Sequence, residues 1–163
     1  MSKKKKVAHP RTITLNTDFV PCAVAAQDEF FRNGIFVFNI TKLKTYIEAH
    51  RDAFATSNID VAYYHTLQAN MKLKDDYIQQ ADLARPVILA EITPDRYEMG
   101  MASGPTDYYA RGYNLIDGHH RVEKAYRLRI MTLQAYIVRM EQHINFLAEG
   151  YEEYIEYWNG KFD

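Results

Sequence analysis

The stretch YNLIDGHHRVEKA, residues 113–125, runs from apolar residues straight into an acid, a glycine, two histidines and an arginine. The apolar residues that lead to Asp117 predict a buried strand over 112–117. The amphipathic pattern that follows predicts a helix over 119–129, and Gly118 permits the tight turn between the two elements. This strand, turn and helix are the most specific structural pattern in the chain. They place polar side chains at the end of a buried strand.

The turn has the properties of an anion site. The N–H groups of Gly118, His119 and His120 have no intrahelical partners there, and a helix N-terminus attracts negative charge. Arg121 adds a donor fork suited to phosphate, and either histidine can donate a proton or a hydrogen bond. Asp117 stands where a carboxylate can hold Mg²⁺ or accept a proton from a hydroxyl.

A purely structural interpretation uses the same residues. Asp117 can be the helix N-cap, His119 and His120 solvated residues of the first turn, and Arg121 a partner for Glu123 or Asp117. A zinc site is disfavoured, because adjacent side chains on a helix diverge and no third ligand lies at a recognised spacing.

Elsewhere the patterning predicts alternating strands and helices, with a long loop over 93–111 that is rich in glycine and proline. We expect one α/β (α+β) domain over residues 11–163, with a small mixed sheet covered by helices. The further strands are predicted at 12–15, 35–40, 86–92 and 132–138. The further helices are predicted at 23–33, at 41–50 with Thr41 as the cap and His50 as the last residue, and at 59–71, 75–84, 140–148 and 151–158. The last of these helices has an aromatic face, which favours core packing over an exposed interface.

The composition limits the classes of protein to which this chain can belong. The chain has 163 residues, 47% of them hydrophobic, and a net charge of −1, which gives no overall attraction to nucleic acid. Its single cysteine, Cys22, cannot form an internal disulfide, and no apolar run approaches the roughly 20 residues that span a bilayer. Residues 1–10 are expected to be a disordered basic tail, with a nucleic-acid-binding arm as the alternative, and we expect a cytoplasmic location.

Residues 114–138 resemble the central box of the ParB/sulfiredoxin-like superfamily, in which a strand, a glycine, a polar-polar-arginine turn, a helix and a strand follow one another. Residues 35–47 resemble the first strand and helix of that family, and 85–92 the strand before its nucleotide-binding box. The specific part is 115–125. The resemblance implies this fold and a turn that binds nucleotide phosphates.

The branches of the family differ in activity, and the residues narrow the choice. Sulfiredoxins carry a nucleophilic cysteine where this chain has His119. ParB proteins have Gly-Glu-Arg-Arg at the turn, of which only Gly118 and Arg121 match, and the 25 residues after Val138 are too few for their DNA-binding domain. Asp117 before the glycine is more similar to a free-serine kinase branch and to the DGHHR box of uncharacterised bacterial proteins.

We therefore expect a protein that binds ATP, ADP or CTP with Mg²⁺, or another phosphate-bearing small molecule, and that transfers phosphate to a small molecule. In this hypothesis Asp117 is the base or the Mg²⁺ ligand, His120 shares the proton transfer, and Gly118, His119, His120 and Arg121 hold the phosphate. The alternative is a non-catalytic module that binds a nucleotide, a nucleic acid or a protein partner. Nuclease activity is disfavoured, because no cluster of acids and histidines suggests a two-metal site.

Overall fold

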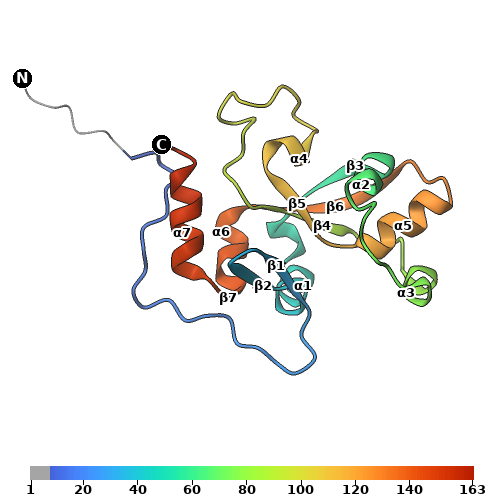
Figure 1. The fold of residues 1–163 in the computed structure, drawn as a ribbon, viewed down its shortest axis with the longest axis horizontal. Coiled ribbons are helices and arrows are strands. Elements are labelled where there is room, and N and C mark those ends of the chain that lie inside the picture. The colour runs from blue at the N-terminus through green and yellow to red at the C-terminus, as the bar shows by residue number, and fades with distance from the viewer. Residues whose placement is uncertain (1–7) are drawn as a thin grey trace, which may run out of the picture.

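The computed structural model describes residues 8–163, and its fold is a mixed α+β one with two sheets (Figure 1). The expected fold class is confirmed. The three-stranded sheet is antiparallel and has the order β1 (Phe30–Asn33), β2 (Phe36–Asn39), β7 (Leu147–Glu149). The four-stranded sheet has the order β3 (Ala55–Asp60), β6 (Thr132–Val138), β4 (Val87–Glu91), β5 (Tyr113–Asp117), and is mixed because only β4 and β6 run parallel.

Seven α-helices occur within residues 8–163. Figure 1 shows α2, α3 and α5 together at one end of the molecule and α7 at the other, with the N-terminal segment running beside α7. No helix in the described part of the chain is long and apolar enough to cross a membrane. The bounds are α1 (Ile40–Ala49), α2 (Val61–Leu67), α3 (Asp75–Gln80), α4 (Tyr108–Arg111), α5 (His119–Arg127), α6 (Met140–His143) and α7 (Tyr151–Gly160), with 3₁₀ turns at Arg51–Ala53 and Ile144–Phe146.

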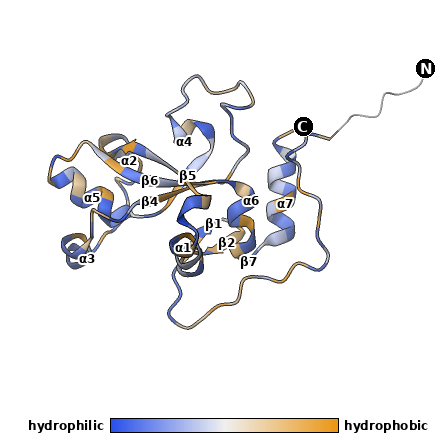
Figure 2. Cartoon of the chain, turned by 180° about the vertical axis from the view of Figure 1, so that it is seen from behind, coloured by the Kyte–Doolittle hydropathy of each residue, from blue (hydrophilic) through white to orange (hydrophobic). Residues whose placement is uncertain are grey.

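The four-stranded sheet has an apolar core on each face. Successive side chains of a strand point to opposite faces, so Val87 and Leu89 of β4 join one core while Ile88 and Ala90 join the other. The first core includes residues of α2 and α5, and the second includes residues of α1, β2 and α7. Figure 2 shows the resulting hydrophobic colour along β4 and β6. Trp158 of α7 is fully buried, which confirms core packing for the C-terminal aromatic face.

Several strands and helices were predicted correctly, with ends that differ by a few residues. These are β2, β4, β5, β6, α1, α3, α5 and α7. The predicted basic tail over 1–10 lies mostly outside the described residues. Residues 8–10 are exposed, although the ring of His9 stacks on Phe162 at 4.2 Å.

The N-terminal predictions were wrong. Residues 12–15 form no strand, and the segment predicted as a helix over 23–33 ends instead in strand β1, which pairs with β2. Asn33, taken with Gly34 as a helix stop, is instead the last residue of β1, and Gly34 begins the two-residue hairpin turn with φ 62°. Pairing with β2 in this hairpin therefore overrides the helical pattern.

Four other predictions about element bounds and caps need correction. The helix predicted over 59–71 begins only at Val61, because the residues before it form β3 and Asp60 caps α2 through the Tyr63 N–H. Asn39, not Thr41, caps α1. The helix predicted over 140–148 breaks after α6 so that β7 can pair with β2, and the predicted loop 93–111 contains the short helix α4.

Candidate functional site

The turn predicted from the sequence is present, and its glycine is required. Gly118 has φ 112°, and a Cβ atom built on it would lie 2.4 Å from Cγ1 of Val87. Helix α5 begins at the next residue, and its first intrahelical bond runs from the Val122 N–H to the Gly118 carbonyl. Among the described residues, the N–H groups of His119, His120 and Arg121 have no hydrogen-bond acceptor and no side chain caps them. The helix therefore presents free donors at this point.

Arg121 is mainly engaged with the protein itself. Its Nη1 donates to the carbonyls of Pro86 (2.6 Å) and Arg85 (3.1 Å), and its Nη2 donates to Oδ2 of Asp117 at 2.5 Å. The side chain is 12% exposed. Its pairing with Asp117, one of the structural alternatives, is observed, whereas Glu123 pairs with His65 instead. Arg121 thus fixes the start of β4 against the turn and has little capacity left for a ligand.

Asp117 lies between two cations. One carboxylate oxygen accepts from Arg121, and the other lies 3.7 Å from Nζ of Lys44 in α1. It does not cap α5, since no side chain does. These neighbours do not fit a resident Mg²⁺ ion, because two cations already face the carboxylate and no group of three metal-ligating side chains gathers within residues 8–163.

The two histidines have different environments. Burial lowers the pKa of His119, so its imidazole is neutral at physiological pH and acts as a hydrogen-bonding group rather than a cation. Its backbone carbonyl accepts from Nε2 of Gln68 at 2.8 Å. The ring of His120 is partly exposed and meets Tyr77 of α3 edge to face, with the centroids 5.6 Å apart.

A groove of about 760 Å³ opens on this turn. Lys44, Arg85 and Arg121 line it together with three acids, so the net side-chain charge of its walls is zero when the histidines are neutral. Arg85 is exposed and forms no ion pair with the described residues. The acids are Glu29, Asp82 and Asp117, and the apolar walls are Phe30, Ile40, Met71, Leu73 and Tyr77.

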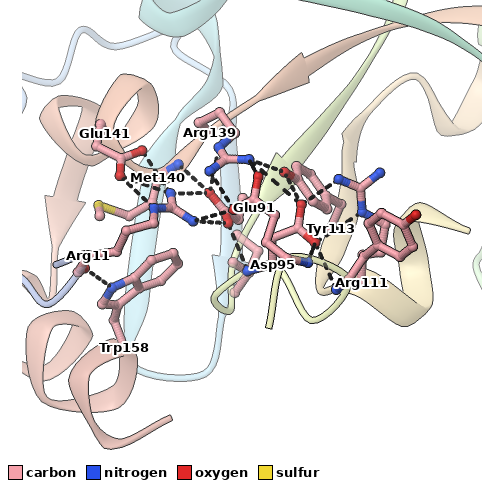
Figure 3. Close-up of polar contacts among 12 residues, drawn as sticks. Arg11, Glu91, Asp95, Arg111, Tyr113, Arg139, Met140, Glu141 and Trp158 are labelled. Atoms are coloured by element: carbon pink, nitrogen blue, oxygen red, sulfur yellow. Dashed lines mark hydrogen bonds and ion pairs between the residues drawn. The ribbon is translucent and has the colours of Figure 1, made fainter. Parts of the chain in front are cut away.

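A second polar cluster, at the end of β4, was not predicted (Figure 3). Glu91 is completely buried, and Arg11 donates to both of its carboxylate oxygens at 2.6 and 2.7 Å. The N–H groups of Asp95 and Met140 donate to the same carboxylate at 2.9 and 3.1 Å. Arg139 lies 3.4 Å away. Every donor to Glu91 is internal, so this cluster is a structural junction between β4, the N-terminal segment and α6.

Asp95 extends the cluster into the 93–111 region. It is 1% exposed and accepts from Arg111 at 2.5 and 3.0 Å and from the Tyr113 hydroxyl at 3.1 Å. Burial opposes its ionisation, but the hydrogen bonds from Arg111, the Glu98 N–H and Tyr113 outweigh burial and lower the pKa of Asp95. The sequence contains one signal for this cluster, because Glu91 is an acid at the end of an otherwise apolar strand.

Comparison of this chain with models of known families, with curated proteins and with solved structures finds no match. The resemblance to the ParB/sulfiredoxin-like superfamily therefore stays a prediction.

Proposed function

We propose that the protein binds the phosphate groups of a nucleotide in the groove beside the Gly118 turn. The observation that supports this most directly is the free N-terminus of α5, which opens onto a groove that also holds Lys44 and Arg85. Backbone N–H groups at a helix start and nearby cations together favour a multiply charged anion. Residues Gly118, His119 and His120 keep the phosphate-binding role expected from the sequence.

The role of Arg121 changes in this proposal. Because its guanidinium is held by two carbonyls and Asp117, it positions the turn, and the cations left to contact a ligand are Lys44 and Arg85. Lys44 has only a distant partner, Asp117 at 3.7 Å, and can swing toward a phosphate. Gly118 supports the turn by leaving room for the buried Val87 side chain and by adopting φ 112°.

The apolar wall favours a nucleotide over inorganic phosphate. Tyr77 is 55% exposed, Met71 is 47% exposed and Phe30 is 37% exposed, and all three line the groove. Aromatic side chains stack well on nucleobases whatever the base. His120 beside Tyr77 adds a second ring to this wall.

The catalytic form of the proposal is phosphate transfer from ATP or ADP to a small molecule with a hydroxyl group. The hydroxyl oxygen bonds to the terminal phosphorus, the bond from that phosphorus to the bridging oxygen breaks, and the shortened nucleotide leaves with the electron pair. Asp117 or His120 accepts the hydroxyl proton. Such a reaction fits the cytoplasmic location predicted from the sequence. A module that binds the nucleotide without turnover is the alternative.

The test is calorimetric titration of the protein with ATP, ADP and CTP, each with magnesium. Lys44→Ala and Arg85→Ala should each weaken binding by roughly ten- to a hundredfold, as expected for the loss of one charge-assisted contact. Lys42→Ala is the matched control, because Lys42 lies on the same helix but does not line the groove. If the unaltered protein binds none of these nucleotides, or if all three variants behave alike, the proposal is wrong.

A further inference from the structure

A second, smaller cavity of about 190 Å³ lies next to the groove and shares His119 and Met71 with it. Its walls are mostly apolar and include Phe31 of β1 and Leu67 of α2. The side chains around it are unusually exposed for their type, since Leu67, Met71 and Tyr109 are 43%, 47% and 48% exposed. Apolar walls of this kind are typical of sites for small organic molecules.

Two polar side chains of this cavity are buried without partners. The Tyr64 hydroxyl and Oε1 of Gln68 form no hydrogen bond with the described residues, although the two residues are only 4% and 6% exposed. The orientation of the Gln68 amide is fixed, because its Nε2 donates to the His119 carbonyl at 2.8 Å. Oε1 is therefore the free acceptor.

The Tyr64 hydroxyl is a free donor. Burial raises the pKa of Tyr64, so the group stays protonated at physiological pH. The backbone N–H of Tyr109 lies near the hydroxyl oxygen, and because an N–H can only donate, it leaves the hydroxyl proton of Tyr64 free. Native proteins rarely leave a buried donor and a buried acceptor unpaired in the wall of one cavity, which points to a bound group that serves both.

We propose that this cavity binds a small alcohol or phenol, a molecule with an apolar body and one hydroxyl group. The hydroxyl accepts a hydrogen bond from Tyr64 and donates one to Oε1 of Gln68, while the body packs against Phe31, Leu67 and Leu115. A hydroxyl fits because it is both donor and acceptor. A hydrocarbon of the same shape should be rejected, since it leaves two buried polar groups unpaired.

This inference goes beyond nucleotide binding and does not need it. The cavity and the groove meet at His119, yet the polar atoms that define the cavity belong to α2 and its end, whereas the groove depends on α1, α5 and Arg85. Each site can therefore be occupied or altered separately.

The test is a nuclear magnetic resonance titration of the labelled protein with p-cresol and with p-xylene, which differ by a hydroxyl in place of a methyl group. We expect p-cresol to bind saturably, with shifts at the amides around Tyr64 and Gln68, and p-xylene to bind at least about tenfold more weakly. No binding of p-cresol up to its solubility, or equal affinities for the two compounds, would overturn the proposal. If p-cresol does not bind, ordered water would be the hydrogen-bond partner of the Tyr64 hydroxyl and of Oε1 of Gln68.

Two tyrosine variants sharpen the test. Tyr64→Phe removes a hydroxyl without a partner, so it should keep or raise the melting temperature while it reduces the preference for p-cresol over p-xylene by about fivefold or more. Tyr113→Phe is the control, because the Tyr113 hydroxyl donates to buried Asp95 at 3.1 Å. It should lower the melting temperature by a few degrees and leave the preference unchanged. A Tyr64→Phe protein that keeps the full preference contradicts the assignment.

Titration with nucleotides in the same experiment separates the two proposals. If p-cresol binds and no nucleotide does, the cavity is supported and the phosphate groove is refuted. If nucleotides bind and p-cresol does not, only the cavity is refuted.

Discussion

Replacing Gly118 by alanine tests the turn on which the whole site depends. The new methyl group would lie 2.4 Å from Cγ1 and 2.7 Å from Cβ of Val87, a residue with no exposed surface. The backbone at φ 112° adds a separate strain, because L-residues with a side chain rarely adopt it. Left-handed strain costs about 1–2 kcal/mol and overpacking about 1–3 kcal/mol, so Gly118→Ala should lose about 2–5 kcal/mol of unfolding free energy.

Urea unfolding measures this loss, and Gly34→Ala separates its two causes. Gly34 also has a positive φ, 62°, but no atom lies within 4 Å of the position where its Cβ would be. Gly34→Ala should therefore show the strain alone, about 1–2 kcal/mol. Adding Val87→Ala to Gly118→Ala removes Cγ1 and should restore part of the loss beyond additivity. Equal losses for the two glycines, or strict additivity with Val87→Ala, would refute the reasoning.

Three further predictions concern charged and titratable groups. Glu91→Gln should cost about 1.5–3 kcal/mol of unfolding free energy, because the partly buried Arg11 loses the charge of its bidentate partner, whereas the exposed control Glu141→Gln should cost less than about 1 kcal/mol; similar losses would contradict the junction. Burial lowers the pKa of His143 to about 4, whereas the ordinary value of histidine is 6.5, so the unfolded chain binds more protons than the folded chain between these two pH values. This group's contribution to stability, about 3 kcal/mol, is fully present above pH 6.5 and should be lost as the pH falls from 6.5 to 4. Urea titrations from pH 4 to 7.5 check this, and a His143→Asn protein with the same pH slope would exclude His143 as its cause. Asp117→Asn should cost about 1–3 kcal/mol of stability, since Arg121 loses its anion, and unchanged stability in urea would show that the ion pair of Asp117 and Arg121 contributes little. With a substrate in hand, the same variant should lower turnover by roughly 10²–10⁴-fold.

The elements predicted correctly are those whose signal is local. Strand β4 is apolar at four of its five positions, and β5 with α5 combines an apolar run, a glycine and an amphipathic pattern. Strand β3, with the sequence ATSNID, has no such pattern, and it is a strand because β6 supplies a pairing partner more than 70 residues later. Strand β1 was mistaken for the end of a helix, because its local pattern is helical and its pairing with β2 is seen only in the fold.

The features of the candidate site also divide into those set by neighbouring residues and those set by distant segments. Sequence reasoning located the turn and its free N–H groups, because these depend on consecutive residues. It could not show that Arg121 donates to the carbonyls of Arg85 and Pro86, or that Gln68 holds the His119 carbonyl, since these contacts join segments 35 to 51 residues apart. The groove and the smaller cavity exist only through such contacts.

The Glu91 junction also bears on the order in which the chain can fold. Arg11 leaves the ribosome well before Glu91, but Arg139, Met140 and Glu141 follow about 50 residues later, and Trp158, whose indole N–H donates to the Arg11 carbonyl, follows later still. Closing contacts between such distant segments is slow, because the entropy of long loops is lost before the contacts form. During synthesis, therefore, the set of donors around the Glu91 carboxylate is incomplete until Arg139 and Met140 have emerged, and β4 can enter its final core only after β6 has been made.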